Sequence, residues 1–229
     1  DLLLIQRHDR KAIYDLQVPE GYQTHFQYFY GYQIDQIRNL IADWGKRYDY
    51  LFSVDSDIVL PNDALVKLIQ ADKDIISGYY IQRKHNETTP ELFKAKNGGV
   101  DHYKVEELEL GLMEIDACGF GCVLIKGHVL NEMKYPHFKY KSSIDFAYTE
   151  SEDTYFCKKA KEKGFKIWAD TTINCGHKGV YFHDAPLPSS TVQSTEYDVE
   201  KRLRDLSKLQ LLPKAHADYL KKIPAPRVA

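Results

Sequence analysis

The chain has 229 residues, of which 43% are hydrophobic, so it is long enough to bury a core of ordinary size. Its 31 basic and 33 acidic residues give a formal net charge of -2, which offers no support for a protein drawn as a whole to nucleic acid or to an anionic membrane. The longest apolar stretch, near 112–130, is interrupted by Glu114, Asp116 and Lys126, and falls short of the roughly 18 residues of a membrane span. The composition therefore predicts an ordinary globular protein that is soluble.

The cysteines bear on the cellular compartment. Four cysteines are too few for a disulfide scaffold in a chain of this size, and all four lie in apolar or helical surroundings. We therefore expect reduced, buried thiols and a cytoplasmic location. The alternative is a zinc site built from Cys118, Cys122, Cys175 and His177, but the sequence has no Cys-x-x-Cys pair to support it.

The first third of the chain alternates strand and helix patterns. Apolar residues recur at helical spacing from Ile34 to Trp44, and Gly45 closes that run before the next apolar strand. The expected elements, in chain order, are strands at 2–5 and 24–30, with a short helix at 11–16 between them, a helix at 34–45, a strand at 50–54, a helix near 63–70 and a strand at 74–80. This β-α-β pattern predicts an α/β fold with a mainly parallel sheet flanked by helices.

The middle and end of the chain are less regular. Residues 83–110 are polar and contain a glycine pair, which predicts a loop with a hairpin, a candidate lid over a ligand site. An apolar strand at 113–125 is broken by Gly119-Phe120-Gly121, where glycine either lets a ligand approach the backbone or forms a bulge. Ser151 is the expected N-cap of a helix that ends at Gly164, and a strand follows at 165–169. Amphipathic spacing near 199–209 predicts C-terminal helices after a linker.

Two carboxylates follow the strand at 50–54. Asp55 and Asp57 are one residue apart, so on an extended backbone they lie on the same side and reach one hard cation with oxygen ligands. Ligands of parallel sheets bind at the carboxyl ends of the strands, where these acids are placed. The alternative is a solvated turn whose acids cap the helix that begins near 61–63.

Several segments in a fixed order resemble the GT-A glycosyltransferases, in particular the broad family-2-like group. They are Arg38-Asn39, the strand that ends in Asp55-Ser56-Asp57, Ile76-Ser77-Gly78-Tyr79-Tyr80, Gly119-Phe120-Gly121, Ser151-Glu152-Asp153 and Gly176-His177. The resemblance covers residues 1–182. It implies a GT-A, Rossmann-like domain with a nucleotide-binding half at 1–82 and an acceptor and catalytic half at 83–182. Residues 183–229, the linker and C-terminal helices, lie outside it.

The resemblance also implies a cofactor and a donor. Asp55, Asp57 and His177 are the expected ligands of Mn²⁺ or Mg²⁺, and the metal neutralises a departing diphosphate. The expected donor is a UDP- or GDP-sugar, and the activity that of a hexosyltransferase. The residues expected to bind this donor are Arg7, Arg38, Asp55, Ser56, Asp57, Arg83, Gly119 and Gly121. Without the resemblance, His177 is interpreted as a surface loop histidine.

The pair Glu152-Asp153 has two interpretations. Acids in the first turn of a helix complement the helix dipole, and this alone accounts for them. The same position keeps a carboxylate ionised, which suits a general base. By resemblance to inverting members, Asp153 is the expected base and Glu152 orients the sugar. A retaining enzyme needs no such base, and the sequence leaves the stereochemistry open.

The alternatives are a nucleotidyltransferase and an inactive sugar-binding or interaction module of the same fold. A nucleotidyltransferase wants a glycine-rich phosphate loop after the first strand, and residues 6–11 are charged but contain no glycine. The acceptor hydroxyl is not specified by the sequence: a glycan, a lipid-linked molecule, a protein or a modified nucleobase all remain open.

Overall fold

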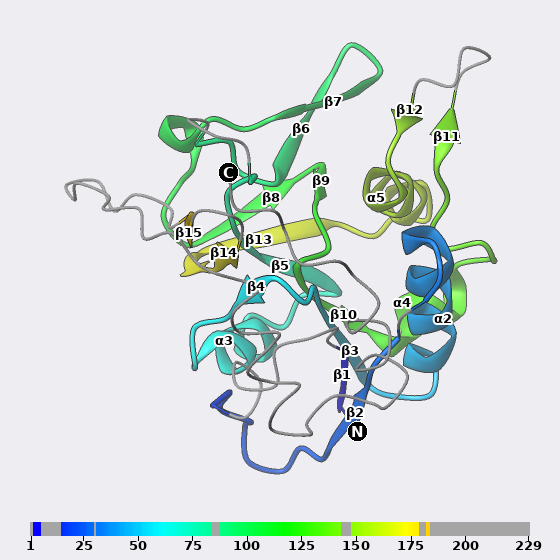
Figure 1. Ribbon diagram of the computed structural model, residues 1–229, viewed down its shortest axis with the longest axis vertical. Helices are drawn as coiled ribbons and strands as arrows, with labels where there is room; N and C mark the ends of the chain where they lie inside the picture. Colours follow the sequence, from blue (N-terminus) through cyan, green and yellow to red (C-terminus); the bar gives the residue numbers. More distant parts are fainter. Residues whose placement is uncertain are drawn as a thin grey trace, which may run out of the picture.

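The computed structural model describes residues 2–5, 15–29, 31–83, 88–142, 148–178 and 182–183 (Figure 1). The expected helix at 11–16 falls almost wholly outside these residues. The same holds for Arg7, the linker and the C-terminal helices. Within the described residues, no helix is both long enough and apolar enough to cross a membrane.

A seven-stranded sheet forms the centre of the molecule. Its strands, in spatial order, are β2 (Thr24–Gln27), β1 (Leu2–Ile5), β3 (Tyr50–Val54), β10 (Cys122–Lys126), β5 (Ile75–Tyr79), β13 (Ile167–Asn174) and β8 (Leu112–Ile115). β1 pairs in parallel with β2 and β3, and β5 pairs in parallel with β13. β10 runs antiparallel to both β3 and β5, and β8 runs antiparallel to β13. The predicted α/β fold is confirmed: five of these seven strands run in the same direction, and β10 and β8 run against them.

Helices cover both faces of this sheet. Side chains of α2 (Ile34–Gly45), α4 (Gly127–Glu132) and α5 (Glu152–Glu162) share one buried cluster with Leu51, Ile75 and Val123. Side chains of α3 (Ala64–Gln70) share another with the next residue of each strand, Phe52, Ile76 and Leu124. Successive residues of a strand point to opposite faces, so these continuous apolar runs supply two cores. Figure 1 shows α3 on one side of the sheet and the other three helices opposite.

Three small sheets complete the part of the fold that the structure describes. β4 (Ile58–Val59), β14 (Gly176–Lys178) and β15 (Phe182–His183) form one, β6 (Leu92–Lys96), β7 (Gly99–His102) and β9 (Ala117–Cys118) another, and β11 (Lys141–Ser142) and β12 (Tyr148–Glu150) the third. The hairpin expected within 83–110 is β6–β7, which turns at Asn97 and Gly98, both with positive φ. A short 3-10 helix, Val105–Glu107, follows.

The apolar stretch at 113–125 is broken at the glycines, as expected, but it is also broken near Asp116, which the sequence did not predict. This stretch is divided among β8 at the edge of the main sheet, β9 in a small sheet and β10 in the sheet centre. Burial alternates along β8, whereas β10 is buried on both faces except at its last residue. The backbone N–H of Asp116 donates to Phe93 in β6, so the chain leaves the main sheet before it reaches the glycines.

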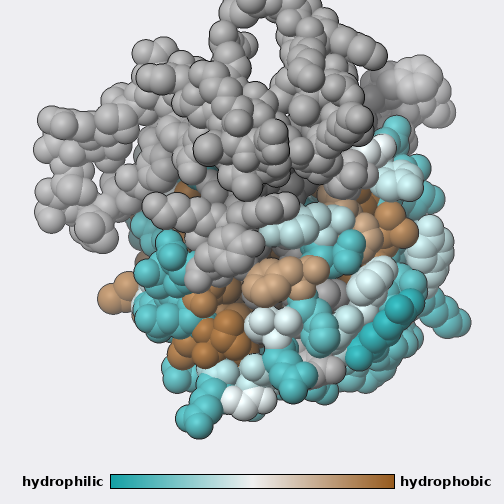
Figure 2. Space-filling model, turned by 60° about the horizontal axis from the view of Figure 1, so that its bottom comes forward, coloured by the Kyte–Doolittle hydropathy of each residue, from teal (hydrophilic) through white to brown (hydrophobic). Residues whose placement is uncertain are grey.

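The surface and the cysteines fit a globular protein. Figure 2 shows a face whose coloured part is mostly hydrophilic, with hydrophobic areas separated by polar ones. The four cysteines are free and buried, so their predicted burial is confirmed. The zinc alternative is wrong, because no three His, Cys, Asp or Glu side chains among the described residues gather closely enough to hold a metal.

Candidate active site

The two acids after β3 lie in a tight turn. The N–H of Asp55 donates to the carbonyl oxygen of Gly121 (3.1 Å), and the N–H of Ile58 donates back to the carbonyl of Asp55 (3.1 Å). The backbone is therefore not extended here, and the expectation that both carboxylates lie on one side of an extended strand is wrong. The capping alternative is also wrong, because Asp63 occupies the N-cap position of α3. Each acid instead has its own basic partner.

Asp55 pairs with Arg38 of α2. The Nη2 atom of Arg38 lies 2.8 and 3.0 Å from the two carboxylate oxygens of Asp55, and Nη1 donates to Ser53 Oγ at 3.2 Å. Nε lies 3.6 Å from Asp153 Oδ1, and the guanidinium stacks over the Phe120 ring. Only 3% of the Arg38 side chain is exposed. Burial alone lowers the pKa of Arg38, but the charges of Asp55 and Asp153 outweigh it and raise the pKa, so this guanidinium is firmly charged.

Asp153 is the second acid on this arginine. It lies in the first turn of α5, whose N-cap Ser151 accepts a hydrogen bond from the N–H of Thr154 (3.3 Å), as the sequence predicts. Asp153 Oδ2 accepts the N–H of Phe120 at 3.1 Å, while the buried Oδ1 has no hydrogen-bond partner. Burial, with the charges of Glu152 and Asp55, raises the pKa of Asp153 well above its ordinary value, although Arg38 opposes the shift.

The expectation that the helix N-terminus keeps Asp153 ionised therefore needs correction. A helix terminus favours a carboxylate by typically 0.3–1 kcal/mol at an exposed site, whereas loss of solvation around a buried carboxylate is a larger effect. Glu152 is also buried, and the hydroxyl of Tyr140 hydrogen-bonds with its carboxylate. Burial and this bond raise the pKa of Tyr140, so the phenol stays protonated and donates. Tyr140 carries no sequence signal that marks it as part of a site.

Asp57 faces His177. β14 pairs with β4 so that His177 lies opposite Ile58, which brings the imidazole to Asp57. Nδ1 of His177 lies 2.7 Å from the carbonyl oxygen of Ile81 and must carry the proton, since a carbonyl only accepts. Nε2, the other ring nitrogen, lies 3.6 Å from Asp57 Oδ2. The interpretation of His177 as a surface loop residue is wrong, because His177 is buried in a strand.

Arg83 is the other partner of Asp57. Its Nη1 lies 2.9 Å from Asp57 Oδ2, and the arginine side chain is 52% exposed. Burial alone raises the pKa of Asp57, but the neighbouring His177 and Arg83 outweigh it and lower the pKa, so this carboxylate is ionised at neutral pH. Ser56 lies in the turn between the two acids and is partly buried.

Gly119 and Gly121 pack against Tyr80, which follows β5. The N–H of Gly121 donates to the Tyr80 hydroxyl at 3.0 Å. A Cβ atom on Gly119 would lie 2.4 Å from that hydroxyl oxygen, and one on Gly121 would lie 2.6 Å from ring carbon Cζ. The Tyr80 ring in turn meets the His177 ring edge to face, with centroids 5.1 Å apart. Close packing thus accounts for both glycines, and their contact with a nucleotide sugar stays a prediction.

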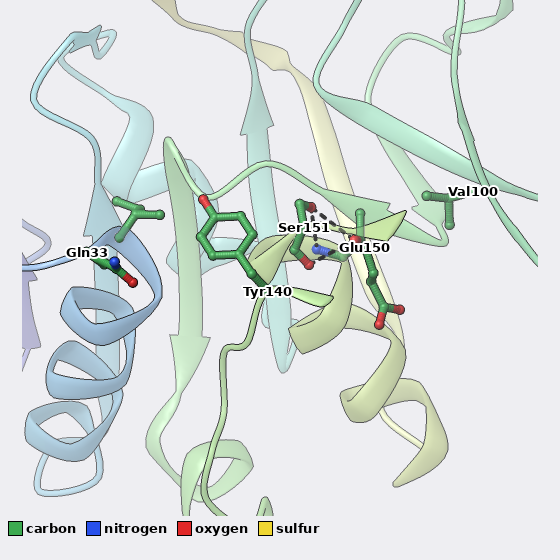
Figure 3. A pocket seen from close by; sticks show the side chains of 7 residues that line it. Gln33, Val100, Tyr140, Glu150 and Ser151 are labelled. Carbon is green, nitrogen blue, oxygen red and sulfur yellow. Dashed lines mark hydrogen bonds between the residues drawn. The ribbon is translucent and has the colours of Figure 1, made fainter. Parts of the chain in front are cut away.

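A cavity of about 770 Å³ opens beside the N-terminus of α5. It is lined by Gln33, Ile34, Val100, Tyr140, Glu150, Ser151 and Thr154. In Figure 3 the ring of Tyr140 lies between Gln33, next to the start of α2, and Ser151 at the start of α5. Asp153 is not in the lining, but Tyr140 joins the cavity wall to Glu152.

The residues proposed as metal ligands fit a cation in part. Asp57 Oδ2 and His177 Nε2 face one another, and the backbone carbonyl of Ile81 holds Nδ1, as the second nitrogen of a metal-ligating histidine is usually held. Asp55 is held by Arg38 instead. No third Asp, Glu, His or Cys of the described residues joins the pair.

No protein-family model matches the sequence, and no curated protein matches it. Solved structures do. A197 from STIV has 17% sequence identity and a TM-score of 0.56, over 86% of this chain and 98% of that one. GalNAc-T7, solved with UDP, GalNAc and Mn²⁺, has 12% identity and a TM-score of 0.52, over 96% of this chain and 53% of that one. The inositol-1-phosphate CTP transferase from T. maritima, at a TM-score of 0.36, is too distant to carry an argument.

These likenesses show the fold. The chain has the α/β architecture of a GT-A glycosyltransferase, and it spans about half the length of the GalNAc-T7 chain that it matches. At identities of 17% and 12%, shared architecture says nothing further about the chemistry.

Proposed function

We propose that the protein is a metal-dependent glycosyltransferase that moves a sugar from a nucleoside diphosphate donor to a hydroxyl acceptor, with inversion at the anomeric carbon. The observation that carries the proposal is Asp153, a carboxylate of raised pKa whose Oδ1 has no hydrogen-bond partner. It lies across Arg38 from Asp55, in an architecture that also occurs in a glycosyltransferase. Perturbed carboxylates of this kind are typical of acid–base sites.

Asp57 and His177 are the proposed protein ligands of Mn²⁺ or Mg²⁺. A bound divalent cation supplies charge that stabilises the departing diphosphate. Asp55, Ser56 and Arg83 surround the same turn and are proposed to hold the nucleotide and the diphosphate of a UDP- or GDP-sugar. The GalNAc-T7 structure, which contains UDP, GalNAc and Mn²⁺, supports this class of donor.

The proposed reaction is a direct displacement. The oxygen of an acceptor hydroxyl forms a bond to the anomeric carbon, the bond from that carbon to the diphosphate oxygen breaks, and its electron pair leaves with the diphosphate. The hydroxyl proton passes to Asp153. A raised pKa makes Asp153 a stronger base than an ordinary aspartate once it is ionised. Turnover is therefore expected to rise as the pH rises through the pKa of this group.

The cavity beside α5 is the proposed place of the acceptor. Its wall combines apolar side chains with Gln33, Ser151 and Thr154, which suits a ligand with both carbon faces and hydroxyls. Glu152, held by Tyr140, is proposed to orient the acceptor or donor sugar. Which glycan, lipid-linked molecule, protein or nucleobase carries the hydroxyl, the domain division at 182 and a cytoplasmic location all stay predictions.

The experiment compares Asp153→Asn with the unaltered protein. UDP- and GDP-sugars are first screened for Mn²⁺-dependent release of UDP or GDP. With the donor that responds, Asp153→Asn is expected to lower turnover by roughly 10² to 10⁴ and to leave donor affinity, measured by calorimetry, nearly unchanged. Glu162→Gln, an exposed acid at the end of the same helix, is the matched control and is expected to keep full turnover.

Three results would contradict the proposal. If turnover is unchanged in Asp153→Asn, Asp153 is not the general base, and the enzyme is either retaining or uses Glu152 as its base. Release of pyrophosphate from a nucleoside triphosphate in the presence of a sugar phosphate indicates a nucleotidyltransferase. Binding of donor without turnover by the unaltered protein, under every acceptor and metal condition, indicates a sugar-binding module.

A further inference from the structure

The two arginines of the site differ in how firmly they are held. Arg38 is 3% exposed and contacts two acids and a serine. Arg83 is 52% exposed, and among the described residues its ion pair is with Asp57, at 2.9 Å. Arg83 follows β5 in the chain, whereas Asp57 lies in the turn after β3.

One oxygen atom of Asp57 lies closest to both of its neighbours, Arg83 and His177. Oδ2 is the atom nearest to both Arg83 Nη1 and His177 Nε2. The bond from His177 Nδ1 to the Ile81 carbonyl turns Nε2 toward Asp57 Oδ2, at 3.6 Å. The guanidinium of Arg83 thus lies on the carboxylate oxygen that the imidazole also faces, in the place where a cation held by Asp57 and His177 would bind.

We propose that Arg83 is an exchangeable counter-ion of Asp57: its guanidinium neutralises Oδ2 in the absence of a divalent cation, and a cation bound by Asp57 and His177 displaces it toward the diphosphate of the donor. This inference rests on the proposed function. It gives Arg83 a part in coupling metal binding to nucleotide binding, in addition to simple contact with the donor.

The strengths of the contacts favour exchange. A half-exposed ion pair shifts an equilibrium by only about 1.4- to 5-fold, so a cation that gains a carboxylate and an imidazole easily displaces it. A released guanidinium matches a diphosphate, because its paired N–H donors fit two phosphate oxygens. Arg38 cannot exchange in this way, since it is itself buried and its displacement would leave Asp55 and Asp153 beside each other without an opposite charge.

The test titrates the full chain with Mn²⁺ alone and follows free Mn²⁺ by electron paramagnetic resonance. Arg83→Gln is expected to bind Mn²⁺ about 2- to 5-fold more tightly than the unaltered protein, because the competing charge is gone. Arg83→Lys keeps the charge and is expected to stay within about 2-fold. Lys67→Gln, which removes a cation from the ion pair with Asp63 on α3, controls for net charge and is expected to change nothing.

A second titration measures UDP at saturating Mn²⁺ by calorimetry. Arg83→Gln is expected to weaken UDP binding by about 10-fold or more, the loss typical of one hydrogen bond to a charged group. Thus one substitution is expected to move the two affinities in opposite directions. A residue with a merely structural part would weaken both.

Contrary outcomes separate this inference from the proposed function. If Arg83→Gln binds Mn²⁺ equally well or more weakly, Arg83 is not an exchangeable counter-ion of Asp57. The proposed metal site still stands in that case if Asp57→Ala abolishes Mn²⁺ binding. Tighter Mn²⁺ binding with unchanged UDP affinity overturns the transfer of Arg83 to the diphosphate. If Asp57→Ala binds Mn²⁺ as well as the unaltered protein, both the inference and the proposed metal site fall.

Discussion

Arg38 joins two acids that come from opposite parts of the chain. Asp55 follows β3 and Asp153 begins α5, and the guanidinium lies between them in a nearly dry environment. A buried charge with this arrangement costs a great deal when only one partner is removed. A substitution of Arg38 is therefore expected to lower the stability of the fold, in addition to any effect on catalysis.

Arg38→Met tests this expectation. Methionine fills a similar volume but leaves Asp55 and Asp153 facing each other without a cation, so the free energy of unfolding at pH 7 is expected to fall by about 3–5 kcal/mol. Urea denaturation followed by circular dichroism measures it. Arg47→Met is the matched control: Arg47 is exposed and stacks on Trp44, and its loss is expected to cost less than about 1 kcal/mol. Equal costs for the two variants would show that the buried bridge contributes nothing special.

Asp153 is expected to weaken the fold at neutral pH. Its pKa in the folded protein lies above the ordinary value, so it contributes stability below about pH 3.9 and loses it as the pH rises toward the folded pKa. Asp153→Asn is therefore expected to be more stable than the unaltered protein at pH 7, and the difference is expected to shrink as the pH falls toward 4. Chemical denaturation at several pH values measures this difference. A difference that grows on acidification would mean that the pKa is lowered instead.

At the scale of elements, the turn between β9 and β10 fits against Tyr80. Gly119 approaches only the hydroxyl end of the ring closely, whereas Gly121 approaches ring carbons as well as the hydroxyl. Because Tyr80 also contacts the ring of His177, this packing links the turn to the proposed metal ligand.

The two glycines are expected to respond differently to Tyr80→Phe. Gly119→Ala in the unaltered protein forces a Cβ to within 2.4 Å of the hydroxyl oxygen, but without that oxygen the nearest ring atom is 3.3 Å away. Its cost, of about 1–3 kcal/mol, is therefore expected to fall in the Tyr80→Phe background. In Gly121→Ala the added Cβ meets ring carbons at 2.6 and 2.7 Å in both backgrounds, so the loss of stability is expected to be nearly the same in each. A double-mutant cycle by urea denaturation measures the cost of each glycine substitution in the two backgrounds. If Tyr80→Phe lowered both costs equally, the turn would be moving away from the ring, and the hydroxyl contact would not be the cause.

Elements with strong local patterns could be predicted from the sequence. The apolar spacing of α2, the cap of α5 and the apolar run of β3 were each sufficient for their elements. The strand that carries His177 could not be predicted, because β14 is short and exists through its pairing with β4, more than a hundred residues earlier. The division of 113–125 likewise depends on partners that no local pattern names.

At the scale of the molecule, the order of motifs predicted the architecture better than the contacts within the site. The α/β sheet and the gathering of Arg38, Asp55 and Asp153 at one end of it follow from the strand–helix order. The pairing of charges does not. Whether Asp57 faces Asp55 or His177 depends on a tight turn of a few residues, and the raised pKa of Asp153 depends on burial in the folded protein and on the charges of Glu152 and Asp55.

The place of β10 has a consequence for how the protein is made. β10 lies between β3 and β5, although it is synthesised some forty residues after β5. While the ribosome adds those residues, the facing edges of β3 and β5 have no partner, and their apolar faces are exposed to other chains. The sheet centre closes late, through contacts of long sequence separation, which are slow to form. Nascent chains that end before Cys122 are therefore expected to be digested by protease and bound by chaperones far more readily than chains released after β13.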